Sequence, residues 1–135
     1  MKVSGITPIL NVSNIKESIE WFRLLGWQTG FQWGEPESFA SVCQSDCEIF
    51  LSLDGQGGRG KGINTSTFGD TPNESSDKGV WMSLWVENVD DAFKLCTDVG
   101  IDITFPPTNM PWNVREMHIR HPDGHVFRVG QGIER

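Results

Sequence analysis

Two stretches of the chain place hydrophobic residues three and four positions apart, as one face of an amphipathic helix does. The first stretch lies within residues 15–25 and the second within residues 89–99. The hydrophobic residues are Ile15, Ile19, Phe22 and Leu25 in the first stretch, and Val89, Phe93, Cys96 and Val99 in the second. Each stretch therefore predicts a helix with one buried face.

The ends of both predicted helices carry matching signals. An asparagine precedes each stretch and an acid follows three residues later, which resembles a capping box. These pairs are Asn14 with Glu17 and Asn88 with Asp91. A glycine stands where a helix favours a left-handed residue at its end, at Gly26 and Gly100.

After each helix the pattern changes to three runs that are typical of strands. These runs cover about residues 27–34, 38–45 and 47–54 in the first half, and 101–105, 113–120 and 125–130 in the second. A further strand precedes each helix, and segment 6–27 aligns without gaps on segment 80–101. The repeat predicts an α+β fold built from two βαβββ modules.

The chain of 135 residues is expected to form a single domain. Module 1 is predicted at 1–55, a connecting loop at 56–79 and module 2 at 80–132. The connection is rich in Gly, Ser, Asn and Asp. Residues 55–61 match the G-x-x-x-x-G-K pattern of a phosphate-binding loop, but Gly62 replaces the expected Ser or Thr and no helical pattern follows. Nucleotide binding is therefore not expected.

The composition favours some classes of binding partner and disfavours others. A net charge of −7 disfavours nucleic acid, whose phosphates need a positive surface. It favours cationic ligands, although solubility alone also explains it. No apolar run reaches the length of a membrane span, and the N-terminal sequence lacks a signal peptide pattern. Six tryptophans supply broad apolar surfaces that also attract cations.

Three cysteines are too few and too irregularly spaced for a disulfide framework or a zinc site. Cys43, Cys47 and Cys96 include no C-x-x-C pair. We expect buried free thiols and a cytoplasmic protein.

The segment "PWNVREMHIRHPDGHVFRVG" at residues 111–130 carries a family resemblance. Its Arg-Glu strand, Pro-Asp-Gly turn and final alternating strand, together with the two modules, resemble the vicinal oxygen chelate superfamily. This superfamily is also called the glyoxalase/bleomycin resistance/dioxygenase superfamily, and the bleomycin-resistance-type branch is the most similar. His121 departs from the family pattern, which usually has Asp before the turn. The resemblance implies curled sheets with helices on their convex sides, a cavity on the concave side, and homodimers that complete the cavities.

The resemblance also implies where a metal would bind. Metal-using members place one ligand on the first and last strand of each module. The matching positions here are Thr7, Trp81, Phe50 or Leu51, and Arg128. Tryptophan cannot coordinate a metal, and the permanent charge of arginine repels one. The prediction is a protein without a metal or another cofactor.

Strand alternation predicts which side chains line the cavity. At residues 81–86, Met82, Leu84 and Val86 are expected to face the helix. Trp81 and Trp85 then lie together on the opposite face, which lines the cavity. Two aromatic walls and a few polar groups suit a ligand with a flat apolar part.

The full set of expected ligand-binding residues is Asn11, Trp33, Phe39, Trp81, Trp85, Trp112, Glu116, His118 and Arg128. Glu116 and His118 could act as an acid/base pair. An ion pair of Glu116 with Arg128 or Arg120, with His118 as a polar neighbour, is the favoured alternative. No catalytic residue is assigned.

The remaining two histidines flank the turn formed by Pro122, Asp123 and Gly124. His121 and His125 are expected to be solvated.

The leading functional hypothesis is a metal-free binding protein that sequesters a small aromatic compound, cationic ones included, in a tryptophan-lined cavity at a dimer interface. The main alternative is a metal-dependent lyase, isomerase or dioxygenase, with Glu48 and His118 as ligands. A ligand-sensing or scaffold domain is a third alternative.

Overall fold

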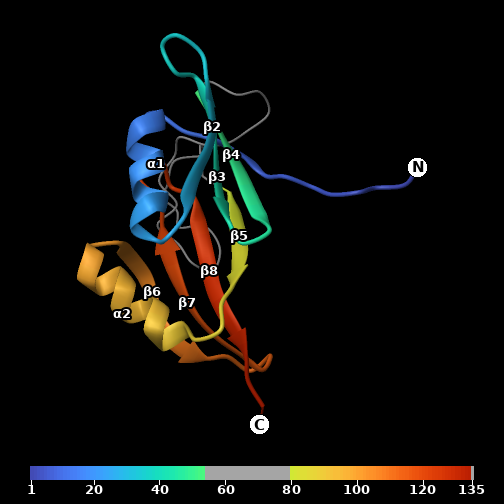
Figure 1. Ribbon diagram of the computed structural model, residues 1–135. Coiled ribbons are helices and arrows are strands. Elements are labelled where there is room, and N and C mark those ends of the chain that lie inside the picture. Colours follow the sequence, from blue (N-terminus) through green and yellow to red (C-terminus); the bar gives the residue numbers. More distant parts are fainter. Residues whose placement is uncertain (54–79, 135) are drawn as a thin grey trace, which may run out of the picture.

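The computed structural model describes residues 1–53 and 80–134. The expected connecting loop at 56–79 and the glycine-rich stretch 55–61 lie outside these residues. Two four-stranded sheets, each with one helix, form the described part of the chain (Figure 1). The α+β prediction with two βαβββ modules is therefore confirmed. Within the described residues, no helix is both long enough and apolar enough to cross a bilayer.

Module 1 contains β1 (Ile9–Asn11), α1 (Ile15–Leu24), β2 (Gln28–Trp33), β3 (Phe39–Gln44) and β4 (Cys47–Ser52). Its sheet has the strand order β1-β4-β3-β2. Strand β1 pairs parallel with β4, and the remaining pairs are antiparallel. Helix α1 connects β1 with β2, which lie at opposite edges of the sheet.

Module 2 contains β5 (Trp81–Trp85), α2 (Val89–Val99), β6 (Asp102–Asn109), β7 (Val114–Arg120) and β8 (Val126–Gly132). Its strand order, β5-β8-β7-β6, repeats that of module 1. Strand β6 runs to Asn109, beyond the predicted end near residue 105. It includes Pro106 and Pro107, which an edge strand can accept, and its register against β7 is irregular around them.

Both helices begin and end where the sequence signals predicted. The side chains of Asn14 and Asn88 each accept a backbone hydrogen bond from three residues ahead, at 2.9 Å. Gly26 and Gly100 have positive φ angles of 92° and 79°. A residue with a Cβ would be strained in this left-handed conformation.

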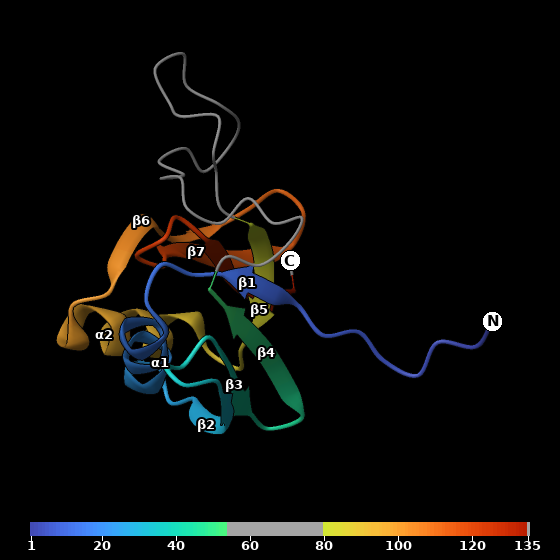
Figure 2. The same cartoon turned by 90° about the horizontal axis from the view of Figure 1, so that it is seen from above.

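The two modules are joined through a shared aromatic core. Trp21 of α1 stacks on Phe127 of β8 with ring centroids 5.7 Å apart, and Phe22 lies 5.9 Å from the same ring. Both helices lie on one side of the molecule, and residues 1–8 extend away from it (Figures 1 and 2). Neither helix covers the opposite face of its sheet (Figures 1 and 2).

The prediction that His121 and His125 are solvated is wrong. Their exposed fractions are 1% and 0%, because the β7–β8 turn packs against the start of module 1. His121 Nε2 lies 3.0 Å from the Ser18 hydroxyl, and His125 Nε2 lies 2.8 Å from the backbone oxygen of Asn11. The Asp123 carboxylate accepts from the backbone N–H of Ser13 at 2.9 Å. The β7–β8 turn thus links module 2 to module 1 through these hydrogen bonds.

Candidate functional site

Alternation along β5 separates core from open face as predicted. Met82 and Leu84 pack against the hydrophobic core. Trp81 and Trp85 lie on the other face, with exposed fractions of 44% and 68%. Both indoles therefore contribute apolar surface to this face.

Glu116 of β7 is the centre of a polar cluster on this open face. Arg128 donates to both carboxylate oxygens, from Nε to Oε2 at 3.0 Å and from Nη2 to Oε1 at 2.7 Å. Trp112 Nε1 donates to Oε1 at 2.9 Å, and His118 Nε2 lies 2.6 Å from Oε2. Because an ionised carboxylate only accepts, His118 carries its proton on Nε2. The predicted ion pair of Glu116 with Arg128 is therefore present.

The hydrogen bonds hold Glu116 ionised. Its side chain is almost fully buried, and this desolvation by itself would raise its pKa. The donors Arg128, His118 and Trp112 together outweigh burial and lower the pKa of Glu116 to about 2. Burial lowers the pKa of His118, against the opposing effect of Glu116, so the imidazole is neutral. A carboxylate held this firmly is a poor general base near neutral pH.

Arg128 lies against two indole rings. Its guanidinium carbon is 5.4 Å from the centre of the Trp81 ring and 6.0 Å from that of Trp112. These are cation–π distances. Strand pairing builds the contact, since Arg128 is in register with Ser83 on β5 and with His118 on β7. The structure thus brings together five of the expected residues: Trp81, Trp112, Glu116, His118 and Arg128.

The open face of module 1 has a second aromatic group. The rings of Phe31, Phe39 and Phe50 lie 5.3 to 5.8 Å apart, centre to centre. Trp33, 69% exposed, stands beside them on β2. A cavity of about 560 Å³ is open here. It is lined by Phe31, Gln32, Trp33, Ser38, Phe39, Ser52 and Leu53.

Sequence reasoning named Trp33 and Phe39 but missed Phe31 and Phe50 as part of this wall. Phe31 is two residues before Trp33 on one strand, a spacing that predicts a shared face. Phe50 belongs to β4, and strand pairing places it opposite Ser41, two residues along β3 from Phe39. The spacing signal could have identified Phe31, but not Phe50.

The other expected ligand residue, Asn11, lies apart from the polar cluster. It is 8% exposed at the end of β1, where its backbone oxygen accepts from His125. Its contacts belong to the junction between the modules.

The four positions where the superfamily places metal ligands do not fit a metal. Leu51 is in the core of module 1, and Phe50 packs among phenylalanines. Trp81 and Arg128 contact each other at a cation–π distance. Thr7 is exposed ahead of β1. Among residues 1–53 and 80–134, no three His, Cys, Asp or Glu residues converge as a metal site would require.

Glu48 and His118, the alternative ligand pair, have other contacts. The thiol of Cys43 lies 3.6 Å from the Glu48 carboxylate on the neighbouring strand. His118 is bonded to Glu116 in the other module. This geometry offers no support for a two-residue metal site.

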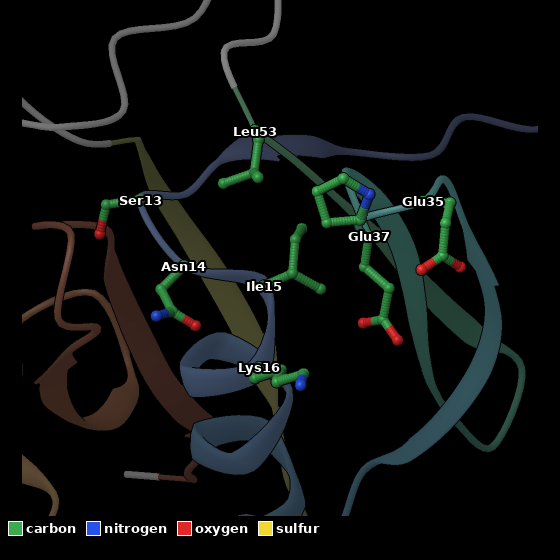
Figure 3. A pocket seen from close by; sticks show the side chains of 8 residues that line it. Ser13, Asn14, Ile15, Lys16, Glu35, Glu37 and Leu53 are labelled. Atoms are coloured by element: carbon green, nitrogen blue, oxygen red, sulfur yellow. The ribbon is translucent and has the colours of Figure 1, made fainter.

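A separate pocket of about 380 Å³ opens at the N-terminus of α1. Figure 3 shows its lining of Ser13, Asn14, Ile15, Lys16, Glu35, Pro36, Glu37 and Leu53. The Asn14 side chain is already used to cap the helix. None of the expected ligand-binding residues lines this pocket.

The fold defines an α+β protein of two βαβββ modules, each a four-stranded mixed sheet with one helix. The model of the glyoxalase/bleomycin resistance protein/dioxygenase superfamily matches residues 5–129. The chain belongs to this superfamily.

Solved structures share the fold at low sequence identity. TioX from Micromonospora sp. ML1 is 17% identical with a TM-score of 0.73, over 97% of this chain and 100% of that one. A bleomycin-binding protein complexed with bleomycin is 15% identical with a TM-score of 0.68, over 96% and 99%. A superfamily member from Sphaerobacter thermophilus is 21% identical with a TM-score of 0.68, over 96% and 98%. No curated protein sequence matches the chain.

Proposed function

We propose that the protein is a metal-free binding protein that captures a small aromatic compound without breaking a bond. The observation that carries this proposal is the polar and aromatic cluster around Arg128, which occupies the position of a metal ligand. A structural neighbour is described as bound to bleomycin, which shows that this fold can hold an organic ligand.

The proposed site lies at the interface of a homodimer. The open faces of the two modules expose Phe31, Trp33, Trp81, Trp85 and Trp112, each at least 44%. Apolar surface of this extent is stabilised when a partner or a ligand covers it. In a dimer, the phenylalanine wall of one subunit would face the tryptophan–arginine cluster of the other.

The net charge of −7 favours cationic compounds through long-range attraction. The charge of the ligand group in direct contact depends instead on local donors and acceptors. We also propose a cytoplasmic location, because all three cysteines, which lie in the described part of the chain, are free thiols.

Titration with bleomycins and planar aromatic compounds, followed by tryptophan fluorescence, tests the proposed function. Saturable quenching with one ligand per site is expected, and Trp81→Phe should reduce it. No response to any of these compounds would contradict the proposal. Elemental analysis of the purified protein should find less than about one tenth of an equivalent of Ni, Zn, Fe or Mn, and a stoichiometric metal would favour an enzyme of the superfamily.

Light scattering coupled to size-exclusion chromatography tests the assembly. A mass of about two chains is expected for a stable dimer. A monomer at micromolar concentration would contradict a site at a dimer interface. Ligand binding would still be tested by the fluorescence titration.

A further inference from the structure

The carboxylate of Glu116 at this site is not accessible to a ligand. Glu116 is fully buried, and each of its oxygens already accepts two hydrogen bonds. A carboxylate has about four acceptor positions, so this one is saturated. A cationic group on a ligand would find no carboxylate oxygen here to accept from it.

The positive charge of the same pair remains accessible. Glu116 bonds Arg128 side-on, through Nε and Nη2, which uses two of the five N–H donors of a guanidinium. Among the residues that the structure describes, Nη1 has no hydrogen-bond acceptor. The Arg128 side chain is 30% exposed. The end of the guanidinium formed by Nη1 and Nη2 can therefore bind a second pair of oxygens.

Arg128 is also held in place before any ligand arrives. Two bonds to a buried carboxylate fix the plane of the guanidinium, and Trp81 and Trp112 lie at cation–π distance from it. A positioned donor loses little conformational entropy when it binds. Both indoles are also partly exposed, at 44% and 48%, so a flat ring bound at Arg128 could contact them.

We propose that the site prefers flat aromatic compounds that carry a carboxylate or similar acidic oxygen group, which binds the free end of Arg128. This inference rests on the proposed binding function and specifies the charge of the ligand group in contact with the protein. Carboxylates bind a guanidinium through two parallel hydrogen bonds, and an ammonium is repelled by it.

The acidity of the whole protein does not oppose this preference at contact distance. At physiological salt, charges more than about 8 Å away are largely screened. The nearest acid, Glu116, is already compensated by Arg128 and by two neutral donors. Of the two charged groups in this ion pair, only the guanidinium is exposed to a ligand.

Three matched naphthalene probes test the inference by isothermal titration calorimetry at pH 7 and 0.15 M salt. They are 2-naphthoate, neutral 2-naphthamide and cationic 2-naphthylmethylammonium. We expect 2-naphthoate to bind at least about tenfold more tightly than the ammonium, with the amide between them. Equal or tighter binding of the ammonium would overturn the inference and leave capture of aromatic compounds intact. If none of the three binds, the inference is overturned, and the fluorescence titration with bleomycins and planar aromatic compounds decides the proposed function separately.

A pair of arginine variants assigns the preference to its residue. Arg128→Lys keeps the charge but loses the paired donors of the guanidinium. It should weaken the binding of 2-naphthoate about tenfold and the binding of 2-naphthamide by less. Arg115→Lys is the matched control, because Arg115 is ion-paired with Asp90 on the helix side of the module. An equal loss in both variants, or no loss in Arg128→Lys, would overturn the role of Arg128. If Arg128→Lys does not fold, judged by circular dichroism, the three-probe comparison on the unmodified protein decides.

Discussion

Lowering the pH from 7.5 to 5 should destabilise the protein through the buried histidines at the module junction. His121 Nδ1 accepts from the backbone N–H of Asp123 at 3.0 Å, so Nε2 carries the ring proton toward Ser18. His125 Nδ1 accepts from the backbone N–H of Val80 at 3.0 Å, and Nε2 donates to Asn11. Both rings are satisfied only when neutral. A second proton on either ring would face an N–H donor.

The pKa values give the direction and size of the effect. Burial, with a smaller contribution from the His125 charge and against the attraction of Asp123, lowers the pKa of His121 from 6.5 to about 3. The unfolded chain therefore binds more protons than the folded chain between about pH 3 and pH 6.5, and stability falls as the pH falls through this window. For His121 alone, about 2 kcal/mol is lost between pH 7.5 and pH 5. Burial lowers the pKa of His125 as well, so its contribution has the same sign.

Urea unfolding at several pH values measures this dependence. His121 by itself should lower the free energy of unfolding by about 1.2 kcal/mol between pH 6 and pH 5, and His125 should add a loss of the same sign. His121→Phe keeps an aromatic ring and removes one titrating group, so its slope in this window should be smaller by about one proton. Between pH 7.5 and pH 8 the two proteins should have the same slope, which serves as the control. Equal slopes between pH 5 and pH 6 would refute the reasoning.

Three further substitutions test other parts of the structure. Glu116→Gln should lower the free energy of unfolding by about 2 kcal/mol in urea, because it leaves Arg128 without its buried partner; an unchanged value would mean that the pair contributes little. Trp85→Ala should change the free energy of unfolding by less than about 0.5 kcal/mol, because the side chain is 68% exposed. It should nevertheless weaken the binding of 2-naphthoate measured by calorimetry, and an unaltered affinity would show that Trp85 is not part of the site. Gly30→Ala would place a Cβ 2.2 Å from the Ser41 hydroxyl oxygen, so a loss of about 1–3 kcal/mol in the same unfolding assay is expected, and a neutral outcome would show that the β2–β3 pair can shift.

Local sequence signals predicted most of the elements because their causes are local. Asn14 and Asn88 cap their helices through bonds that span three residues. Alternation placed Trp81 and Trp85 on the open face of β5, since successive side chains of any strand point to opposite sides. The end of β6 was predicted too early because proline usually ends a strand, and an irregular register with β7 accommodates it here.

The site was predicted only in part. The ion pair of Glu116 with Arg128 was foreseen because strand alternation brings β7 and β8 side chains to one face. Its further donor, Trp112, comes from the loop before β7, and no spacing rule fixes the direction of that indole. The ring of Phe50 joins Phe31 and Phe39 only through the pairing of β4 with β3.

The two βαβββ modules, the helix ends and the faces of most strands could be predicted from local patterns, because hydrophobic period and capping act over a few residues. The burial of His121 and His125 could not, because it depends on contacts between distant parts of the chain. Their partners, Ser18 and Asn11, are 103 and 114 residues away in the chain, and docking of one module on the other brings them together. The same holds for the charge offered to a ligand. The chain is acidic, but burial and four hydrogen bonds enclose Glu116 and leave the guanidinium of Arg128 accessible.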